Sequence, residues 1–210
     1  MLGSIVSAEF AKAPAGQRSV ARVEKTEIPG PAAPIPVRIY TPAGAGPFPV
    51  LVYFHGGGWA AGSPATHDDV CRFFCNRIPC IVLSVAYRLA PKHRFPAAFD
   101  DAYAATVWAR NNPGRLHSDP ERLAVAGDSA GGNLAAAVSL ASRDRGGPHL
   151  VLQVLTFAAT DLTSLDTDSY RRNTAAAGLT REKVIRYRDQ YLQGPEDRMN
   201  PYVSPLRAAD

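Results

Sequence analysis

A serine flanked by glycines is the first feature of this sequence that could do chemistry. The segment "VAGDSAGGN" covers residues 125–133 and places Gly127, Ser129 and Gly131 in the pattern G-x-S-x-G. It lies between a predicted strand and a predicted helix, where a nucleophile elbow is found. Small residues allow the sharp turn, and the helix directs its first amides at the same point. We therefore predict that Ser129 is a nucleophile in an elbow that includes Asp128, the alternative being a purely structural glycine turn.

A run of three glycines could provide what such a nucleophile needs. The segment "HGGGW" covers residues 55–59 and directly follows an apolar run. Consecutive glycines cost backbone entropy, so a local reason for them is expected. When a serine attacks an ester carbonyl, the resulting oxyanion needs hydrogen-bond donors that are already in place. We predict that the amides of Gly57 and Gly58, with that of Ala130, form this oxyanion hole.

We assign supporting roles to the two residues before Gly57. Gly56 is the first glycine of the loop, and His55 directly precedes it. His55 could be considered as a catalytic base, but its neighbours favour a histidine that braces the loop through hydrogen bonds. The alternative for the whole loop is a flexible glycine turn. That alternative does not explain why the sequence also contains a nucleophile motif, which would need the donors of such a loop.

The elements that must position these motifs alternate between strands and helices. Apolar runs without polar interruption are typical of strands that are covered on both faces. The segments between these runs have apolar residues at helical spacing, and they begin with acidic residues or end at glycine or proline, as helices do. This alternation predicts an α/β fold with a mostly parallel sheet and helices on both faces. The expected strands are 34–42, 49–54, 80–88, 122–128 and 150–157, and the expected helices are 67–78, 96–112 and 131–145.

Composition limits the classes of partner. The chain has 210 residues, a net charge of +4 and 46% hydrophobic residues, which fits one folded domain. Basic residues are scattered, and those in residues 180–191 alternate with acids, so we expect a solvated helix and no nucleic-acid partner. There is no run long enough to span a bilayer and no secretory signal pattern, which favours a cytoplasmic protein. A homo-oligomer is left open.

The three cysteines are expected to be buried small hydrophobic residues. They are Cys71, Cys75 and Cys80, and an odd number without a signal sequence argues against a disulfide framework. Cys71 and Cys75 share one face of the expected helix, but His67 alone is weak support for a metal site. We therefore expect no metal and no other cofactor.

The motifs together resemble the hormone-sensitive-lipase-like carboxylesterases, a branch of the α/β-hydrolase fold, from about residue 23 to the end of the chain. The resemblance implies a serine esterase that cleaves short- to medium-chain carboxylic esters, EC 3.1.1.-, through an acyl-enzyme and without a cofactor. It also implies that Tyr87 and Arg88 belong to the scaffold behind the glycine loop, and that Asp128 is not the acid of the catalytic triad. The matching segments are "HGGGW" (55–59), "YRLAP" (87–91), "FPAAFDD" (95–101), "GDSAGG" (127–132) and "NPYVSPL" (200–206).

The resemblance also implies what should follow the last motif. In the family the triad acid and base come beyond "SPL", whereas this sequence stops four residues after it. We expect residues 23–210 to form a hydrolase domain without its C-terminal part, which would expose a strand edge. Residues 1–22 would be a loose leader or the remnant of an N-terminal cap. His149, expected at the far end of a strand, is not predicted to be the base, and Asp161 is expected to be structural.

Two classes of function are compatible with these observations. The first is a serine carboxylesterase or lipase-like hydrolase that acts on a small-molecule ester. The second is a catalytically silent protein that binds a small molecule on an esterase scaffold, because some members of the family lack the catalytic histidine.

Overall fold

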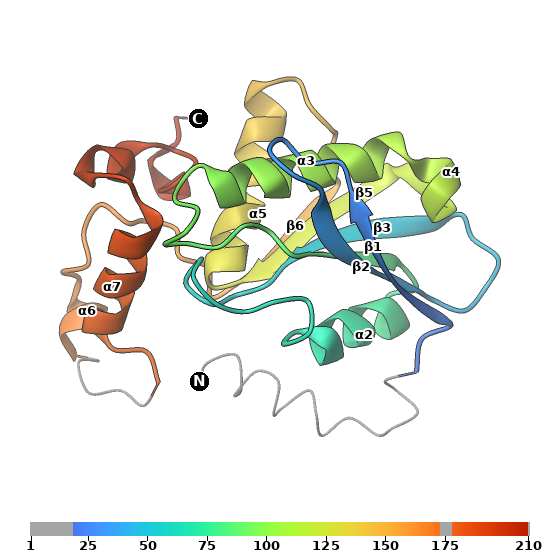
Figure 1. Ribbon diagram of the computed structural model, residues 1–210, viewed down its shortest axis with the longest axis horizontal. Coiled ribbons are helices and arrows are strands. Elements are labelled where there is room, and N and C mark those ends of the chain that lie inside the picture. Colours follow the sequence, from blue (N-terminus) through green and yellow to red (C-terminus); the bar gives the residue numbers. More distant parts are fainter. Residues whose placement is uncertain (1–18, 173–177, 210) are drawn as a thin grey trace.

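A six-stranded sheet with helices on both faces forms the body of the protein (Figure 1). The computed structural model describes residues 19–172 and 178–209. The strand order is β1-β2-β4-β3-β5-β6, in which β1, β2 and β4 are antiparallel neighbours and β4, β3, β5 and β6 run parallel. The strands are β1 Arg22–Ile28, β2 Ile35–Thr41, β3 Phe48–Phe54, β4 Ile81–Val85, β5 Ser118–Asp128 and β6 Leu152–Thr156.

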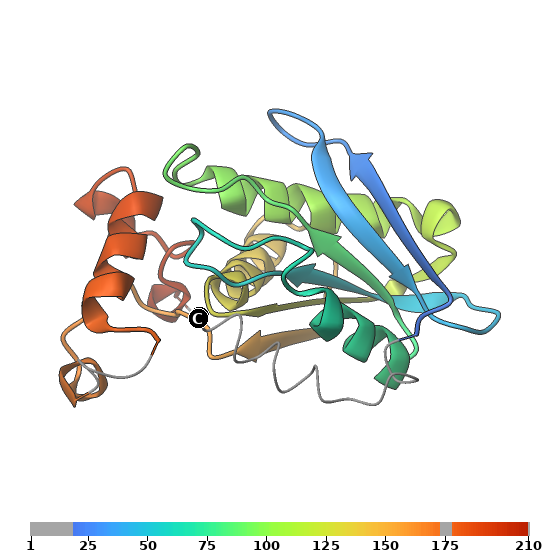
Figure 2. The ribbon, with the colours of Figure 1, turned by 60° about the horizontal axis from the view of Figure 1, so that its bottom comes forward.

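The helices divide between the two faces of the sheet. Helix α2 covers one face, and α3, α4 and α5 cover the other (Figures 1 and 2). Helices α6 and α7 lie away from both layers, beyond the carboxyl ends of the parallel strands. The bounds are α2 Asp68–Arg77, α3 Ala97–Asn111, α4 Pro113–Leu116, α5 Ala130–Asp144, α6 Asp168–Arg172 and α7 Arg181–Tyr191, followed by the 3-10 turns η2 Pro195–Met199 and η3 Pro205–Arg207.

Each face of the sheet has its own hydrophobic core. Strands β3 and β4 are apolar on both faces and are buried almost throughout, as the uninterrupted apolar runs predicted. The larger core lies under α3 and α5, and includes Phe54, Phe99 and Leu134. The smaller core lies under α2, and includes Tyr40 and Cys71. The predicted α/β architecture with a mostly parallel sheet is therefore confirmed.

Strand β6 differs from the buried strand that its apolar run predicted. It is the last strand in the order and pairs only with β5 among the described residues. Leu152 is 54% exposed and Leu155 is 39% exposed, with Val151 and Phe157 exposed beside them. The prediction of a strand buried on both faces is wrong here, because nothing in the described chain covers this edge. The expectation of an exposed strand edge is confirmed.

The N-terminal part contains a strand that was not predicted. Residues 1–18 lie outside the described residues, so most of the expected leader is not assessed. Strand β1 begins at Arg22, and four of the seven residues in its sequence "RVEKTEI" are charged. It pairs antiparallel with β2 along its whole length.

Among the described helices, none has the length and apolar character needed to cross a membrane.

Candidate active site

The two motifs meet because strands β3 and β5 are parallel neighbours. In the register of this pair Phe54 lies opposite Gly127, so both strands end at the same edge of the sheet. The loop after β3 and the turn after β5 therefore emerge side by side. They line one cavity of about 660 Å³, and Ser129 lies in its wall with the three glycines of the loop.

Ser129 occupies the tight turn that the sequence predicted between a strand and a helix. Strand β5 ends at Asp128 and helix α5 begins at Ala130, which leaves Ser129 alone in the turn. Its φ is 54° and its ψ is −116°, a backbone conformation that L-residues rarely adopt. A Cβ at Gly131 would overlap the carbonyl of Phe54, so the turn can pack against β3 only with glycine there. The geometry is that of a nucleophile elbow.

The glycine loop turns its backbone toward the same cavity. Gly57 has a φ of +131°, and a Cβ there would overlap the carbonyl of Ala61. That conformation and that close approach both require glycine. None of the backbone hydrogen bonds of the described residues uses the amides of Gly57, Gly58 or Ala130. All three residues border the elbow or the cavity, so these donors are free for a ligand.

Asp128 connects the glycine loop to the elbow. Its Oδ1 accepts hydrogen bonds from the amide of Gly56 at 2.9 Å and from the Tyr53 hydroxyl at 2.8 Å. The Nε2 atom of His67 lies 3.2 Å from the same oxygen. Burial acts to raise the pKa of Asp128, but the interactions with His67, Tyr53 and Gly56 outweigh it and lower the pKa below its ordinary value. The buried carboxylate is therefore ionised at neutral pH.

His55 is enclosed behind the glycine loop. Its ring is 1% exposed and stacks on Tyr87, with ring centroids 4.3 Å apart. Its Nδ1 lies 2.9 Å from the carbonyl oxygen of Gly56, and the Tyr87 hydroxyl donates to the carbonyl of His55 at 2.6 Å. Burial lowers the pKa of His55 to about 4, so the ring is neutral at pH 7 and its Nδ1–H donates to Gly56.

The expected scaffold role of Arg88, next to Tyr87, is also visible. Arg88 forms a two-pronged ion pair with Asp101, with distances of 2.8 and 3.0 Å to Oδ1, and its own amide donates to Oδ2 at 2.9 Å. Asp101 is 1% exposed and belongs to α3. The segment after β4 is thus anchored to the helix layer behind the loop.

Of the five histidines, all within the described residues, His67 alone lines the cavity that contains Ser129. Its Nδ1 lies 2.9 Å from the Thr66 hydroxyl, and its Nε2 faces Asp128. Both ring nitrogens are therefore engaged. His149 is exposed and precedes β6, at the opposite edge of the sheet from Ser129, as expected.

Asp161 has structural partners, as the sequence suggested. Its carboxylate binds Arg207 at 2.7 Å and accepts from both the amide and the hydroxyl of Thr163, at 2.8 and 2.5 Å. Nearby, the Ser204 hydroxyl accepts from the amide of Leu162. The "SPL" motif therefore fixes the segment that follows β6.

Helix α7 closes the outer side of the cavity. Gly58 packs directly against the ring of Tyr187, and a Cβ at Gly58 would overlap that ring. Lys183 and Val184 from the same helix also line the cavity, while Phe157 and Leu162 line it from the segment after β6. The predicted helix over 180–191 is confirmed, but one of its faces lines the cavity instead of meeting solvent.

The cysteines are buried as predicted. Cys71 and Cys75 are fully buried, Cys80 is 3% exposed, and all three are free thiols. Burial raises the pKa of each to about 12, so they are unreactive at neutral pH. The described residues contain no group of three His, Cys, Asp or Glu side chains that could hold a metal ion.

Sequence reasoning missed how the two motifs are joined. It placed Asp128 in the elbow but gave it no partner, and it considered His67 only as a weak metal ligand. The pair is 61 residues apart in the chain, so no local pattern reports it. Two residues could have indicated this pair. His67 follows the glycine loop closely in the sequence, and Asp128 stands at a position of the elbow pattern that does not require an aspartate.

Comparison with known proteins supports the geometry. Residues 51–210 match the model of a family described as having the α/β-hydrolase fold. The carboxylic ester hydrolase LipN of Mycobacterium tuberculosis is 45% identical over 192 residues, which are 89% of this chain and 51% of LipN. The arylesterase of Saccharolobus solfataricus is 40% identical over 84% of this chain and 57% of its own length. The chain thus spans about half the length of the curated relatives it matches.

Solved structures of esterases superpose closely on this chain. A hyperthermophilic esterase from the archaeon Pyrobaculum calidifontis superposes with a TM-score of 0.90 at 42% identity, covering 98% of this chain and 65% of that one. The thermostable carboxylesterase EstE1, from a metagenomic library, also gives 0.90, at 38% identity and with 99% and 70% coverage. The chain therefore belongs to the α/β-hydrolase fold family, and the relatives named here are ester hydrolases.

Proposed function

We propose that this chain carries the nucleophile and the oxyanion hole of a serine carboxylesterase. In this proposal Ser129 attacks the ester carbonyl carbon, the alcohol leaves, and an acyl group remains on the Ser129 oxygen until water removes it. The amides of Gly57, Gly58 and Ala130 bind the oxyanion of each tetrahedral intermediate. His55 and Gly56 support the loop, while Gly127, Asp128 and Gly131 support the elbow.

One observation carries this proposal. A serine in a strained strand-to-helix turn lines the same cavity as a loop whose amides make no other backbone hydrogen bond. Donors that are fixed before the reaction stabilise an oxyanion without reorganisation. A passive binding pocket has no need for a strained serine opposite such donors. Moreover, the relatives named above are hydrolases, which does not favour the alternative of a silent binding protein.

The substrate class follows from the cavity and the motifs. A volume of about 660 Å³ accommodates a small-molecule ester, and Phe157, Leu162 and Val184 give it an apolar lining. We propose short- to medium-chain carboxylic esters, in keeping with the hormone-sensitive-lipase-like motifs. Three free, buried cysteines fit the proposed cytoplasmic location, where thiols remain reduced.

Turnover also needs a base that accepts the Ser129 proton. His67 is the only histidine in the cavity wall, and both of its nitrogens face other groups. His55 is buried behind the loop. In this proposal a base from outside the described residues completes the site, and the described residues alone give only slow hydrolysis.

A chimera tests this proposal. The segments of the Pyrobaculum calidifontis esterase that this chain does not match would be joined to it, and hydrolysis of p-nitrophenyl butyrate would be measured. We expect activity that Ser129→Ala removes almost completely, while Ser164→Ala, at an exposed serine outside the cavity wall, leaves it unchanged. Equal activity in the Ser129→Ala chimera would refute the assignment.

A further inference from the structure

Helix α7 borders a second cavity besides the one that contains Ser129. This second cavity has a volume of about 270 Å³. Lys183 and Tyr187 line both cavities and lie four residues apart, so the cavities meet at one face of α7. Figure 1 shows α7 beyond the carboxyl ends of the parallel strands, the edge at which Ser129 lies. The residues that line the second cavity are Ala60, Pro91, Lys183, Arg186, Tyr187 and Gln190.

Lys183 brings a cation into the wall of the Ser129 cavity. Among the described residues, it is the one lysine or arginine that lines this cavity. The side chain is half-buried, and its Nζ donates to the carbonyl oxygen of Gly178 at 2.7 Å. An ammonium has three donors, so two are left. No carboxylate of the described residues forms an ion pair with Lys183, and residues 173–177, which precede Gly178, contain no acid.

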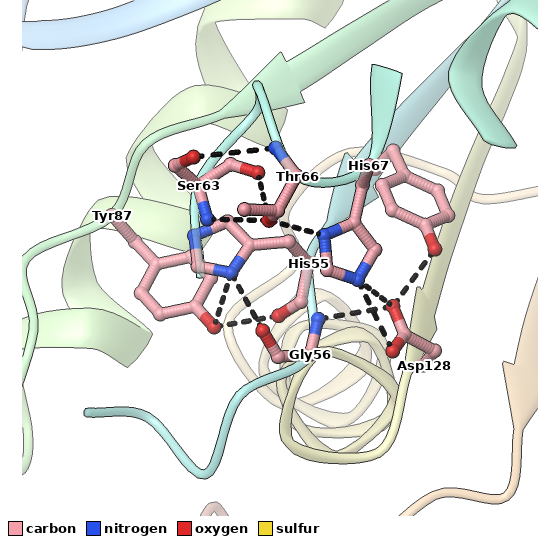
Figure 3. A network of polar contacts seen from close by, with 8 residues as sticks. His55, Gly56, Ser63, Thr66, His67, Tyr87 and Asp128 are labelled. Atoms are coloured by element: carbon pink, nitrogen blue, oxygen red, sulfur yellow. Dashed lines mark hydrogen bonds and ion pairs between the residues drawn. The ribbon is translucent and has the colours of Figure 1, made fainter. Parts of the chain in front are cut away.

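The one acid in the wall of the Ser129 cavity is Asp128, and it is bound elsewhere. Its Oδ1 accepts from the amide of Gly56 and from the hydroxyl of Tyr53, and His67 lies beside it. Figure 3 shows the Asp128 carboxylate between Gly56 and His67. An anionic group of a ligand would be repelled by Asp128 and attracted by Lys183. Within this cavity, the place for such a group is therefore the α7 side.

The same face of α7 carries further hydrogen-bond donors. Arg186, Tyr187 and Gln190 lie three, four and seven residues after Lys183, which places the four side chains on one face of the helix. None of these three has a side-chain hydrogen bond or ion pair to a described residue. A guanidinium, a phenol and a primary amide can each donate to a carboxylate. The face is therefore supplied with donors that have no partner within the described chain.

The acids of α7 do not neutralise this face. Glu182 and Asp189 line neither of the two cavities. The carboxylate of Asp189 instead pairs with Arg188 at 2.9 Å. Among the described residues, Lys183 and Arg186 thus border the second cavity without a carboxylate beside them in its wall.

We propose that this face of α7 binds an anionic group of the substrate, so that the protein prefers esters that carry a carboxylate away from the scissile bond. Half-esters of aliphatic dicarboxylic acids have this chemistry. The substrate class rests on the proposed function, whereas the anion site does not.

The position of α7 gives such a substrate a direct path. Tyr187 packs against Gly58, so the face begins beside the proposed oxyanion donors. Lys183 lies about one helical turn, roughly 5.4 Å, further along α7. A short acyl chain therefore reaches from Ser129 to the donors of this face. Hydrogen bonds to a charged acceptor are stronger than those to a neutral one, so a carboxylate gains more here than the methyl end of a simple acyl chain.

Binding without turnover tests the anion site. Monoethyl adipate and ethyl hexanoate have acyl chains of the same length and differ in a terminal carboxylate or methyl group. Each would be titrated calorimetrically into the 210-residue chain carrying Ser129→Ala, which prevents hydrolysis. We expect monoethyl adipate to bind about 10-fold or more tightly than ethyl hexanoate, and Lys183→Met to remove most of this difference. Lys183→Arg should retain it, and Arg186→Met, at an exposed residue, should reduce it.

The control for net charge is Lys25→Met, because Lys25 is exposed on β1 and lines neither cavity. It should leave the preference for monoethyl adipate unchanged. Equal binding of the two esters to the parent chain, or equal effects of Lys183→Met and Lys25→Met in folded proteins, would overturn the proposal.

Turnover in the chimera separates the anion site from the proposed function. The ratio of kcat/KM for monoethyl adipate to that for ethyl hexanoate would be measured by titrating the released acid. We expect Lys183→Met to lower this ratio about 10-fold and Lys25→Met to leave it unchanged. If hydrolysis depends on Ser129 but the ratio is the same in Lys183→Met, the anion site is refuted and the proposed function stands. If Ser129→Ala has no effect on hydrolysis, the proposed function is refuted, and the calorimetric result still decides on the anion site.

Discussion

The amide of Gly56 donates a hydrogen bond of 2.9 Å to Oδ1 of Asp128, which ties the glycine loop to the residue before the nucleophile. The loop and the elbow come from different strands, so this bond sets one in relation to the other. Gly56 itself has no room for a side chain, because a Cβ there would overlap the Asp128 carboxylate. Loop, elbow and carboxylate are thus one packed unit.

Replacing Asp128 should therefore destabilise the whole protein. Asp128→Ala leaves the Gly56 amide, the Tyr53 hydroxyl and His67 without their acceptor in a buried site. Leaving a buried donor without an acceptor costs about 1–3 kcal/mol, and because at least two buried donors lose their acceptor we expect a loss of about 3 kcal/mol in urea unfolding. Asp166→Ala removes only an exposed ion pair with Arg171 and should change stability far less. Equal effects of the two substitutions would contradict the assigned network.

The buried, neutral His55 should make stability depend on pH. Its pKa falls from 6.5 in the unfolded chain to about 4 in the folded protein, chiefly through burial. The unfolded state then binds the extra proton between these values, so the free energy of unfolding should fall as the pH drops from 6.5 toward 4. The total effect is on the order of 3 kcal/mol. Urea unfolding at several pH values would measure it, and His55→Gln should flatten the curve in this window. A curve of the same slope in wild type and variant would contradict the assignment.

Gly57 should tolerate no side chain. Its φ of +131° and its approach to the carbonyl of Ala61 mean that Gly57→Val must shift the loop. We expect kcat of the chimera to fall on the order of 10²-fold, because an oxyanion donor is misplaced. The loop is largely buried rather than at the surface, so some loss of stability should accompany it. Gly114→Ala is the control, since nothing lies within 4 Å of a Cβ there. An unchanged kcat in folded Gly57→Val would count against the oxyanion assignment.

The open edge at β6 should promote self-association. Leu152 lies on this edge and is 54% exposed, and an apolar strand with no partner on one side among the described residues is a site for pairing between chains. We expect Leu152→Lys to reduce the association seen by light scattering. Ile78→Lys changes an equally exposed residue, 55%, at the end of α2 and away from the edge. If both substitutions act alike, general hydrophobicity and not the strand edge is responsible.

The parts of the fold that the sequence predicted are those with a local cause. Strands β3 and β4 were recognisable because burial on both faces demands uninterrupted apolar residues. The turn at Ser129 was recognisable because only small residues permit it. Strand β1 was missed because six of its seven residues are partly or fully exposed and four are charged, which resembles a loop. Its stability comes from pairing with β2, a contact that no local pattern records.

The site was predictable in its motifs but not in its connections. Gly57, Gly58 and Ser129 could be named from spacing, since each motif is contiguous. The His67–Asp128 pair depends on how α2 is placed against the edge of β5, and the Tyr187 contact with Gly58 depends on where α7 lies. Both are tertiary relationships between distant segments.

The most direct test of the central claim replaces Ser129 by a nucleophile that needs no base. In Ser129→Cys the thiol would lie at the N-terminus of α5, where its pKa is lowered and part of it is thiolate at pH 7. The thiolate attacks the carbonyl carbon of p-nitrophenyl acetate, p-nitrophenolate leaves, and an acetyl thioester remains. The native cysteines are buried and do not compete. Mass spectrometry would count acetyl groups at residue 129 of the 210-residue chain. The account predicts one acetyl group per chain, formed on the order of 10²-fold faster than in the exposed control Ser164→Cys, because the oxyanion donors are in place. Acetylation no faster than in that control would show that the elbow and the glycine loop do not form an acyl-transfer site.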